Sequence, residues 1–65
     1  MKTLIIRMPT VMARTGLSRA MIYLLVARGD FPRQVQIGPR AVGWVEDEIE
    51  SWIEERVRRR NQQAA

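Results

Sequence analysis

The 65-residue sequence contains no cysteine and no histidine. Without cysteine, neither a disulfide nor a thiolate-held metal can stabilise the fold. Without histidine, the commonest metal ligand and the usual general base are both missing. The longest stretch without a charged residue, Ala20–Ala27, is eight residues long, far short of the roughly 20 apolar residues of a membrane-spanning helix. A chain of this size is expected to form one domain with a thin core.

The N-terminal residues, MKTLIIRMPT, begin like a signal peptide, but their apolar run, Leu4–Ile6, is short and no small-residue cleavage pattern follows it. We therefore expect no export signal and a cytoplasmic protein. The glycines form no phosphate-binding loop and no nucleophile stands beside a base. The sequence thus predicts no catalytic site, no metal, no cofactor and no small-molecule substrate.

Charge is unevenly distributed along the chain. Residues 1–44 carry seven basic residues against one acidic residue, residues 45–55 carry six acidic and no basic ones, and residues 56–60 add four arginines. Ten of the eleven basic residues are arginine, whose planar guanidinium can bond two acceptors of a phosphate or a guanine at once. The basic excess of residues 1–44 favours a polyanionic partner, although an ordinary solvated surface would have the same composition.

Two short helices joined by a tight turn are predicted in the first half. Pro9 suits the first turn of a helix that runs to Arg14, and Gly16 supplies the left-handed residue that ends it. Ser18 is a good N-cap for a second helix over residues 19–28. Two helices with such a turn are typical of a helix-turn-helix, whose second helix enters the major groove of DNA.

The second predicted helix has a core side and a free side. Ile22, Leu25 and Val26 recur at the i, i+3, i+4 spacing of a core stripe. On the free side, Arg19 can bond a guanine through both guanidinium arms and Ala20 offers a methyl contact. Ser18 and Tyr23 can hold phosphate. The alternative is a plain corner between two helices that happens to expose an arginine and a tyrosine.

A β-hairpin is predicted over residues 33–44, RQVQIGPRAVGW, where Val35 and Ile37 alternate with glutamines before a Gly-Pro-Arg turn. A basic hairpin directly after a helix-turn-helix is typical of a wing that lies along the DNA backbone. An ordinary solvated turn is the alternative. The candidate backbone contacts are Arg28, Arg33, Gln36 and Arg40, with Gln34 assisting.

An amphipathic helix is predicted from about Glu46 to Arg60, with acids at its start and arginines at its end, as the helix dipole favours. The acidic start is interpreted as capping rather than as a metal or acid–base site. The arginines at the end fit either a solvated helix end or an extra phosphate clamp. Trp44 is expected to be a core anchor, and the predicted buried stripe of the helix is Val45, Ile49, Trp52, Ile53 and Val57.

The blocks TGLSR..IY, G.FP, GPRAVGW and EIE.WI occur in this order. With them, residues 4–60 resemble the AlpA family of prophage regulators, within the MerR-like and excisionase-like winged-helix group. The resemblance implies a mainly α winged helix-turn-helix with three helices and a small β-hairpin, in a DNA-binding protein of the bacterial nucleoid. By position, Ser18, Arg19 and Tyr23 match the recognition helix and Arg40 matches the wing turn.

Two positions depart from the family pattern. Leu24 stands where the family usually has arginine or lysine, and Pro39 stands where glycine is more frequent. Leu24 should remove a phosphate contact and leave an exposed apolar residue available for self-association. Pro39 should stiffen the wing.

Together these features predict one domain over residues 1–65, ordered over about 4–60 with a frayed tail at 61–65, that binds double-stranded DNA. Control of prophage genes is the favoured role. The alternatives are an excisionase-like DNA-bending factor and, in another class, a protein-interaction module such as an anti-repressor. One recognition helix contacts few bases, so a homodimer or a cooperative array on DNA is expected.

Overall fold

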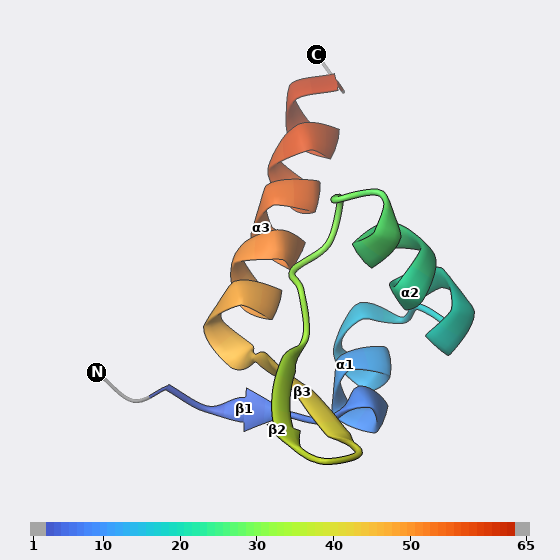
Figure 1. Cartoon of the computed structure of the whole chain (residues 1–65). Helices are drawn as coiled ribbons and strands as arrows, with labels where there is room; N and C mark the ends of the chain where they lie inside the picture. Colours follow the sequence, from blue (N-terminus) through green and yellow to red (C-terminus); the bar gives the residue numbers. More distant parts are fainter. Residues whose placement is uncertain (1–2, 64–65) are drawn as a thin grey trace.

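The protein folds into three helices and a three-stranded antiparallel sheet, described for residues 3–63 in a computed structural model (Figure 1). This arrangement confirms the predicted mainly α fold with a wing. The strand order is β1-β3-β2, so the expected hairpin gains a third strand from the N-terminal segment. The elements in chain order are β1 (Ile5–Ile6), α1 (Met8–Thr15), α2 (Arg19–Ala27), β2 (Val35–Gly38), β3 (Ala41–Val45) and α3 (Glu46–Gln63).

The turn between α1 and α2 is fixed by the residues that predicted it. Gly16 caps α1 with φ 75°, a left-handed conformation that only glycine adopts without cost, and its N–H donates to the carbonyl of Met12 at 2.8 Å. The Ser18 hydroxyl accepts a hydrogen bond from the N–H of Met21 at 3.2 Å, the expected N-cap of α2. The helix-turn-helix geometry therefore follows from two local capping signals.

The inner face of the sheet packs against the helices. Ile6 pairs with Trp44 and Gln36 pairs with Val42 across the strands, and residues directly opposite each other point to the same side. Ile6 and Trp44 are buried. The glutamine side of β2 therefore faces toward the helices, and its valine and isoleucine face outward, opposite to the usual arrangement of apolar residues inside and polar residues outside.

The core combines residues from all three helices. Val11 of α1 and the predicted core residues Ile22, Trp44 and Ile49 are fully buried, while Leu25, Val26, Trp52 and Ile53 pack partly buried around them. Phe31, which the sequence did not single out, is also buried, and its ring meets that of Trp52 edge to face at 4.9 Å. The fully and partly buried residues together confirm the apolar stripe of α2 and, for Ile49, Trp52 and Ile53, that of α3, whereas Val45 belongs to β3 and not to the helix.

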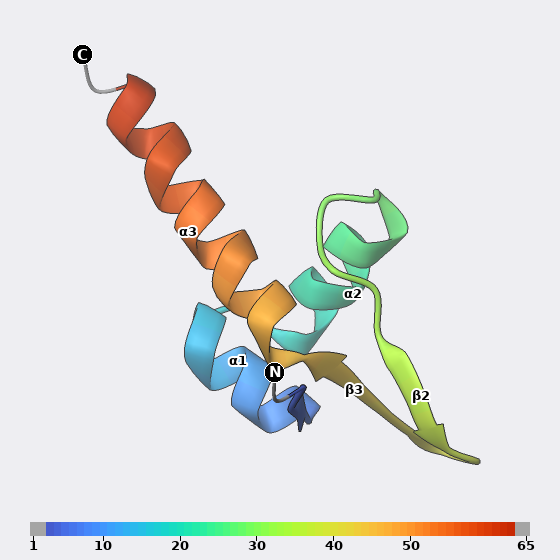
Figure 2. The same ribbon diagram turned by 90° about the vertical axis from the view of Figure 1, so that its left-hand side faces the viewer.

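Helix α3 is longer than predicted. It continues to Gln63 rather than ending at Arg60 before a frayed tail, and the remaining tail residues, 64–65, lie outside the described part of the chain. With a length of about 27 Å at 1.5 Å per residue, α3 extends past the other elements (Figures 1 and 2). The prediction that Val57 lies on the buried stripe is therefore wrong, and its side chain is 43% exposed. Within residues 3–63, none of the helices has the length and apolar character needed to span a membrane.

Candidate nucleic-acid interface

The free side of α2 carries the residues predicted to meet DNA. Arg19, Ala20 and Tyr23 are all exposed, whereas Ile22 on the other side is fully buried. The Tyr23 ring lies 6.5 Å from that of Trp44, tilted by 56°. Because Trp44 is itself buried on β3, it limits the positions that the tyrosine ring can take.

Ser18 caps α2 and keeps its hydroxyl hydrogen available as a hydrogen-bond donor. Its hydroxyl oxygen accepts the hydrogen bond from Met21, and the hydroxyl hydrogen can still be donated to a phosphate oxygen. The side chain is held at the N-terminus of α2, where the helix dipole favours an anion. Ser18 can therefore cap the helix and bind a phosphate at once.

A small open pocket separates α2 from the hairpin. Its lining residues are Val26 of α2, Val42 of β3, and the three polar residues Arg33, Gln34 and Gln36. The Gln36 amide donates to the carbonyl of Gly38 at 3.1 Å, which holds its side chain along the strand and leaves its amide oxygen as an acceptor. The inverted alternation of β2 thus places polar groups, not apolar ones, beside α2.

The arginines of α2 and the wing are not neutralised by the protein. Arg28 caps the C-terminus of α2, Arg33 lies in the loop that follows, and Arg40 lies at the hairpin tip. These three, together with Arg19, are exposed and take part in none of the ion pairs seen among residues 3–63. Arg7, at the start of α1, shares this property and was not singled out from the sequence.

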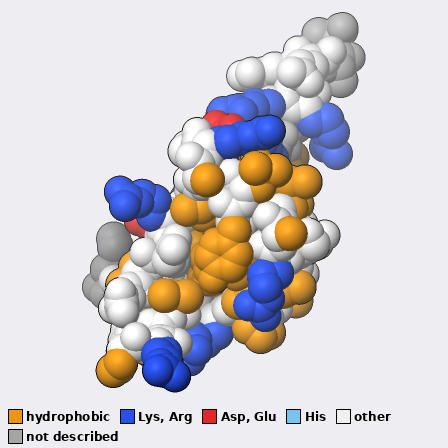
Figure 3. Space-filling view, turned by 45° about the vertical axis from the view of Figure 1, so that its right-hand side comes forward, with side chains coloured by type: hydrophobic (Ala, Val, Ile, Leu, Met, Phe, Trp, Pro, Cys, Tyr) orange, Lys and Arg blue, Asp and Glu red, His pale blue; other side chains and the backbone are white. Residues whose placement is uncertain are grey.

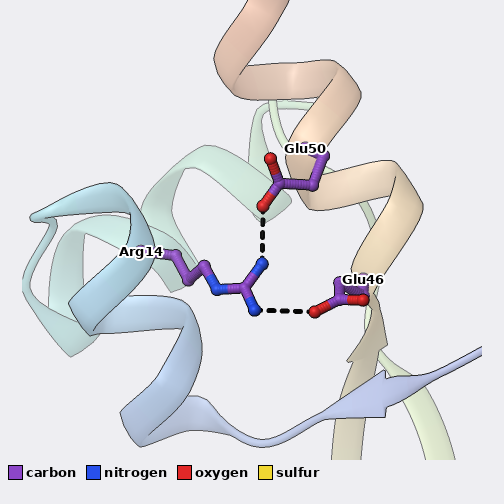
Figure 4. A network of polar contacts seen from close by, with 3 residues as sticks. All are labelled: Arg14, Glu46 and Glu50. Carbon is purple, nitrogen blue, oxygen red and sulfur yellow. Dashed lines mark hydrogen bonds and ion pairs between the residues drawn. The ribbon is translucent and has the colours of Figure 1, made fainter.

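Arg14 has a different role, shown in Figure 4. Its guanidinium donates to Glu50 at 2.6 Å and to Glu46 at 2.7 Å. These hydrogen bonds, with that of Glu50 the larger cause, raise the pKa of Arg14 above its ordinary value. Two of the acids at the start of α3 therefore join α1 to α3, which agrees with the structural interpretation of the acidic segment. The sequence signal for this contact was the spacing of Glu46 and Glu50. They lie four residues apart and therefore on one side of the helix, where a single arginine can bond both carboxylates.

The arginines at the end of α3 bond within their own helix. Arg58 and Arg59 lie 2.8 and 3.5 Å from the carboxylate of Glu55, and the Arg56 guanidinium lies 4.8 Å from the ring centroid of Trp52. The C-terminal end of α3 and the hairpin tip lie at opposite ends of the molecule (Figure 2). This placement favours a solvated helix end over a clamp on a duplex bound at α2.

Both tryptophans hold the loop between α2 and β2. The Trp44 indole N–H donates to the carbonyl of Pro32 at 3.0 Å, and that of Trp52 donates to the carbonyl of Asp30 at 2.7 Å. Between these two carbonyls, Phe31 is buried in the core. The tryptophans thus act as the predicted anchors, and they also fix the segment that carries Arg33.

On the face to which α2 belongs, hydrophobic side chains gather in the middle and lysine and arginine side chains lie around them (Figure 3).

Residues 4–57 match the family described as "Prophage CP4-57 regulatory protein (AlpA)". The chain belongs to the AlpA family. The resemblance found in the sequence is thereby confirmed over nearly all of its expected extent.

Two relatives of this AlpA-family chain are similar over most of its length. It is 42% identical over 52 residues to "Uncharacterized protein ORF88" of Enterobacteria phage P4, a match that covers 80% of this chain and 59% of that protein. It is 40% identical over 58 residues to "DNA-binding transcriptional activator AlpA" of Escherichia coli strain K12, covering 80% of this chain and 83% of that protein. The chain thus spans less than two thirds of the phage relative.

Proposed function

We propose that this AlpA-family chain binds double-stranded DNA with sequence preference and regulates the transcription of prophage genes. The observation that carries the proposal is the division of its arginines. Those on α2 and the wing are exposed and unpaired among residues 3–63, whereas Arg14, Arg58 and Arg59 bond carboxylates. The Escherichia coli relative is named as a DNA-binding transcriptional activator, which supports the same function.

In this function α2 enters the major groove and the hairpin follows the backbone. Arg19, at the first position of α2, is placed to contact a base edge, because the N-terminal residues of a recognition helix reach deepest. Tyr23, one turn later and backed by Trp44, lies on the same exposed side. Arg33 and Arg40, at the base and tip of the wing, are assigned to phosphates.

Genomic DNA pull-down followed by sequencing tests this function. The chain, at physiological salt, should recover a small set of fragments that share a short motif near prophage promoters. The Arg19→Ala variant is the matched control for base contact, since it should lose about 1–3 kcal/mol on those fragments and relax the preference at one base pair. Recovery of all sequences alike would contradict sequence-preferring binding. An equal loss of affinity for Arg19→Ala on every duplex would contradict the contact between Arg19 and a base. Fragments gathered at an attachment site instead of promoters would favour an excision factor.

A further inference from the structure

The outward side of the sheet is apolar, and its side chains are partly or fully exposed. Val35 pairs with Gly43 and Ile5 pairs with Val45, which places them on the side opposite to Trp44. Ile37 shares this side, because its Cδ1 lies 3.7 Å from the position that a Cβ on Gly43 would take. We name Ile5, Val35, Ile37 and Val45 the outer sheet face. Val35 is 38% and Ile37 46% exposed.

A second exposed apolar area lies on α2. Met21 and Leu24 are 41% and 43% exposed, and their i, i+3 spacing puts them on one side of the helix. Arg28, four residues after Leu24, continues this side and is exposed. We name Met21, Leu24 and Arg28 the α2 flank. Since the sheet packs its other face toward the helices, the outer sheet face and the α2 flank cannot meet within one molecule.

The two areas are complementary in charge as well as in apolar character. Val35 and Val45 line one end of an open groove together with Asp47 and Glu48 at the start of α3, and the groove also contains Arg33 and arginines farther along α3. Both acids are exposed and take part in none of the ion pairs seen across residues 3–63. An apolar patch bordered by two carboxylates therefore matches an apolar patch that ends in an arginine.

We infer that the outer sheet face of one copy binds the α2 flank of a second copy on an adjacent DNA site. This inference rests on the proposed function and adds a protein contact to it. In this arrangement Arg28 faces the Asp47 and Glu48 carboxylates of the neighbouring copy rather than a phosphate. Because the two patches differ, the contact is head to tail and can repeat along the duplex.

The small size of the patches makes this contact depend on DNA. A stable interface buries about 800 Å² per partner, contributed by roughly 20–30 residues, and the α2 flank supplies three residues. Two copies held side by side on a duplex face each other at an effective concentration on the order of 1 mM. A contact with a dissociation constant of about 0.1 mM then raises the affinity of the second copy about tenfold.

The experiment uses a duplex recovered in the pull-down, cut to lengths that hold one copy or two. Binding is followed by gel shift with the whole chain and with Ile37→Thr and Leu24→Gln, both changes of exposed side chains. The unmodified chain should occupy the two-copy duplex with about tenfold cooperativity. Each variant should bind the one-copy duplex as the unmodified chain does and lose the cooperativity on the longer one. Circular dichroism checks that both variants fold, and Val35→Thr replaces Ile37→Thr if that variant does not.

A mixture of the two variants tests the head-to-tail order. In the mixture, the intact α2 flank of Ile37→Thr can bind the intact outer sheet face of Leu24→Gln. Partial cooperativity should therefore return in the mixture and not with either variant alone. Cooperativity that survives in Leu24→Gln alone would indicate a symmetric contact between two outer sheet faces and overturn the inference. Independent filling of the two-copy duplex by the unmodified chain would overturn it while leaving DNA binding intact. Failure to bind any duplex would overturn the proposed function as well.

Discussion

Removal of the Arg40 side chain should make DNA binding less sensitive to salt. Arg40 lies exposed at the hairpin tip and outside the ion pairs found over residues 3–63, so its charge is available to a phosphate. Each arginine that neutralises a phosphate releases a condensed counterion, and the logarithm of the binding constant then falls with the logarithm of salt concentration by about 0.9 per contact. Arg40→Ala should therefore flatten the slope by about 0.9.

The expected size of the effect can be measured directly. Between about 50 and 200 mM salt, one phosphate contact changes the binding constant about 3.5-fold. The ratio of the dissociation constants of Arg40→Ala and the unmodified chain should thus be about 3.5 times larger at the low salt concentration than at the high one. Fluorescence anisotropy with a labelled duplex gives both constants. The same ratios should hold for a scrambled duplex, because a phosphate contact carries no sequence information.

Arg58→Ala is the matched control for the loss of one positive charge. Arg58 bonds Glu55 at 2.8 Å on α3, whose C-terminal end lies far from the hairpin tip (Figure 2). This variant should leave the slope unchanged. An unchanged slope for Arg40→Ala would refute the contact between the wing tip and phosphate. Equal flattening by both variants would show that net charge, and not a local contact, sets the salt dependence.

Three further predictions concern the stability of the fold. Ile22→Val should lower the free energy of unfolding by about 0.5–1.5 kcal/mol in urea titration, because Ile22 is fully buried; no loss would contradict its place in the core. Gly43→Ala should cost about 1–3 kcal/mol, since the added methyl would collide with the side chain of Ile5, and a neutral result would show that β1 can shift. Arg14→Gln should lower the melting temperature more at low than at high salt, because exposed ion pairs are screened, and a loss independent of salt would argue against the ion pairs.

The parts of the fold that the sequence predicted depend on local signals. Gly16 and Ser18 set the turn between α1 and α2 through their own backbone and side-chain hydrogen bonds. The start of α3 at Glu46 follows from the change from strand to helical spacing. The exposed side of α2 follows from helical periodicity once Ile22 is placed in the core. Such features need no knowledge of what lies across the fold.

The parts that the sequence missed depend on contacts between distant segments. Arg14 and Glu50 are 36 residues apart, and nothing near Arg14 distinguishes it from the arginines that remain unpaired. Phe31 follows a helix end, a position typical of an exposed loop, yet the tryptophan hydrogen bonds draw its segment into the core. The direction of the alternation on β2 was also undetermined, because period-two spacing fixes two faces without stating which one is inner.

The placement of the acids explains how the same chain can be both folded and open to a polyanion. Acids beside α2 or the wing would bond Arg19 or Arg40 and compete with phosphate. Instead, the acids of α3 lie at its start and middle, where Glu46 and Glu50 bond Arg14 and Glu55 pairs with Arg58 and Arg59 of its own helix. The blocks of opposite charge along the sequence thus become separated in space, so that Arg14 joins α1 to α3 while the arginines of α2 and the wing stay exposed and outside the ion pairs of residues 3–63.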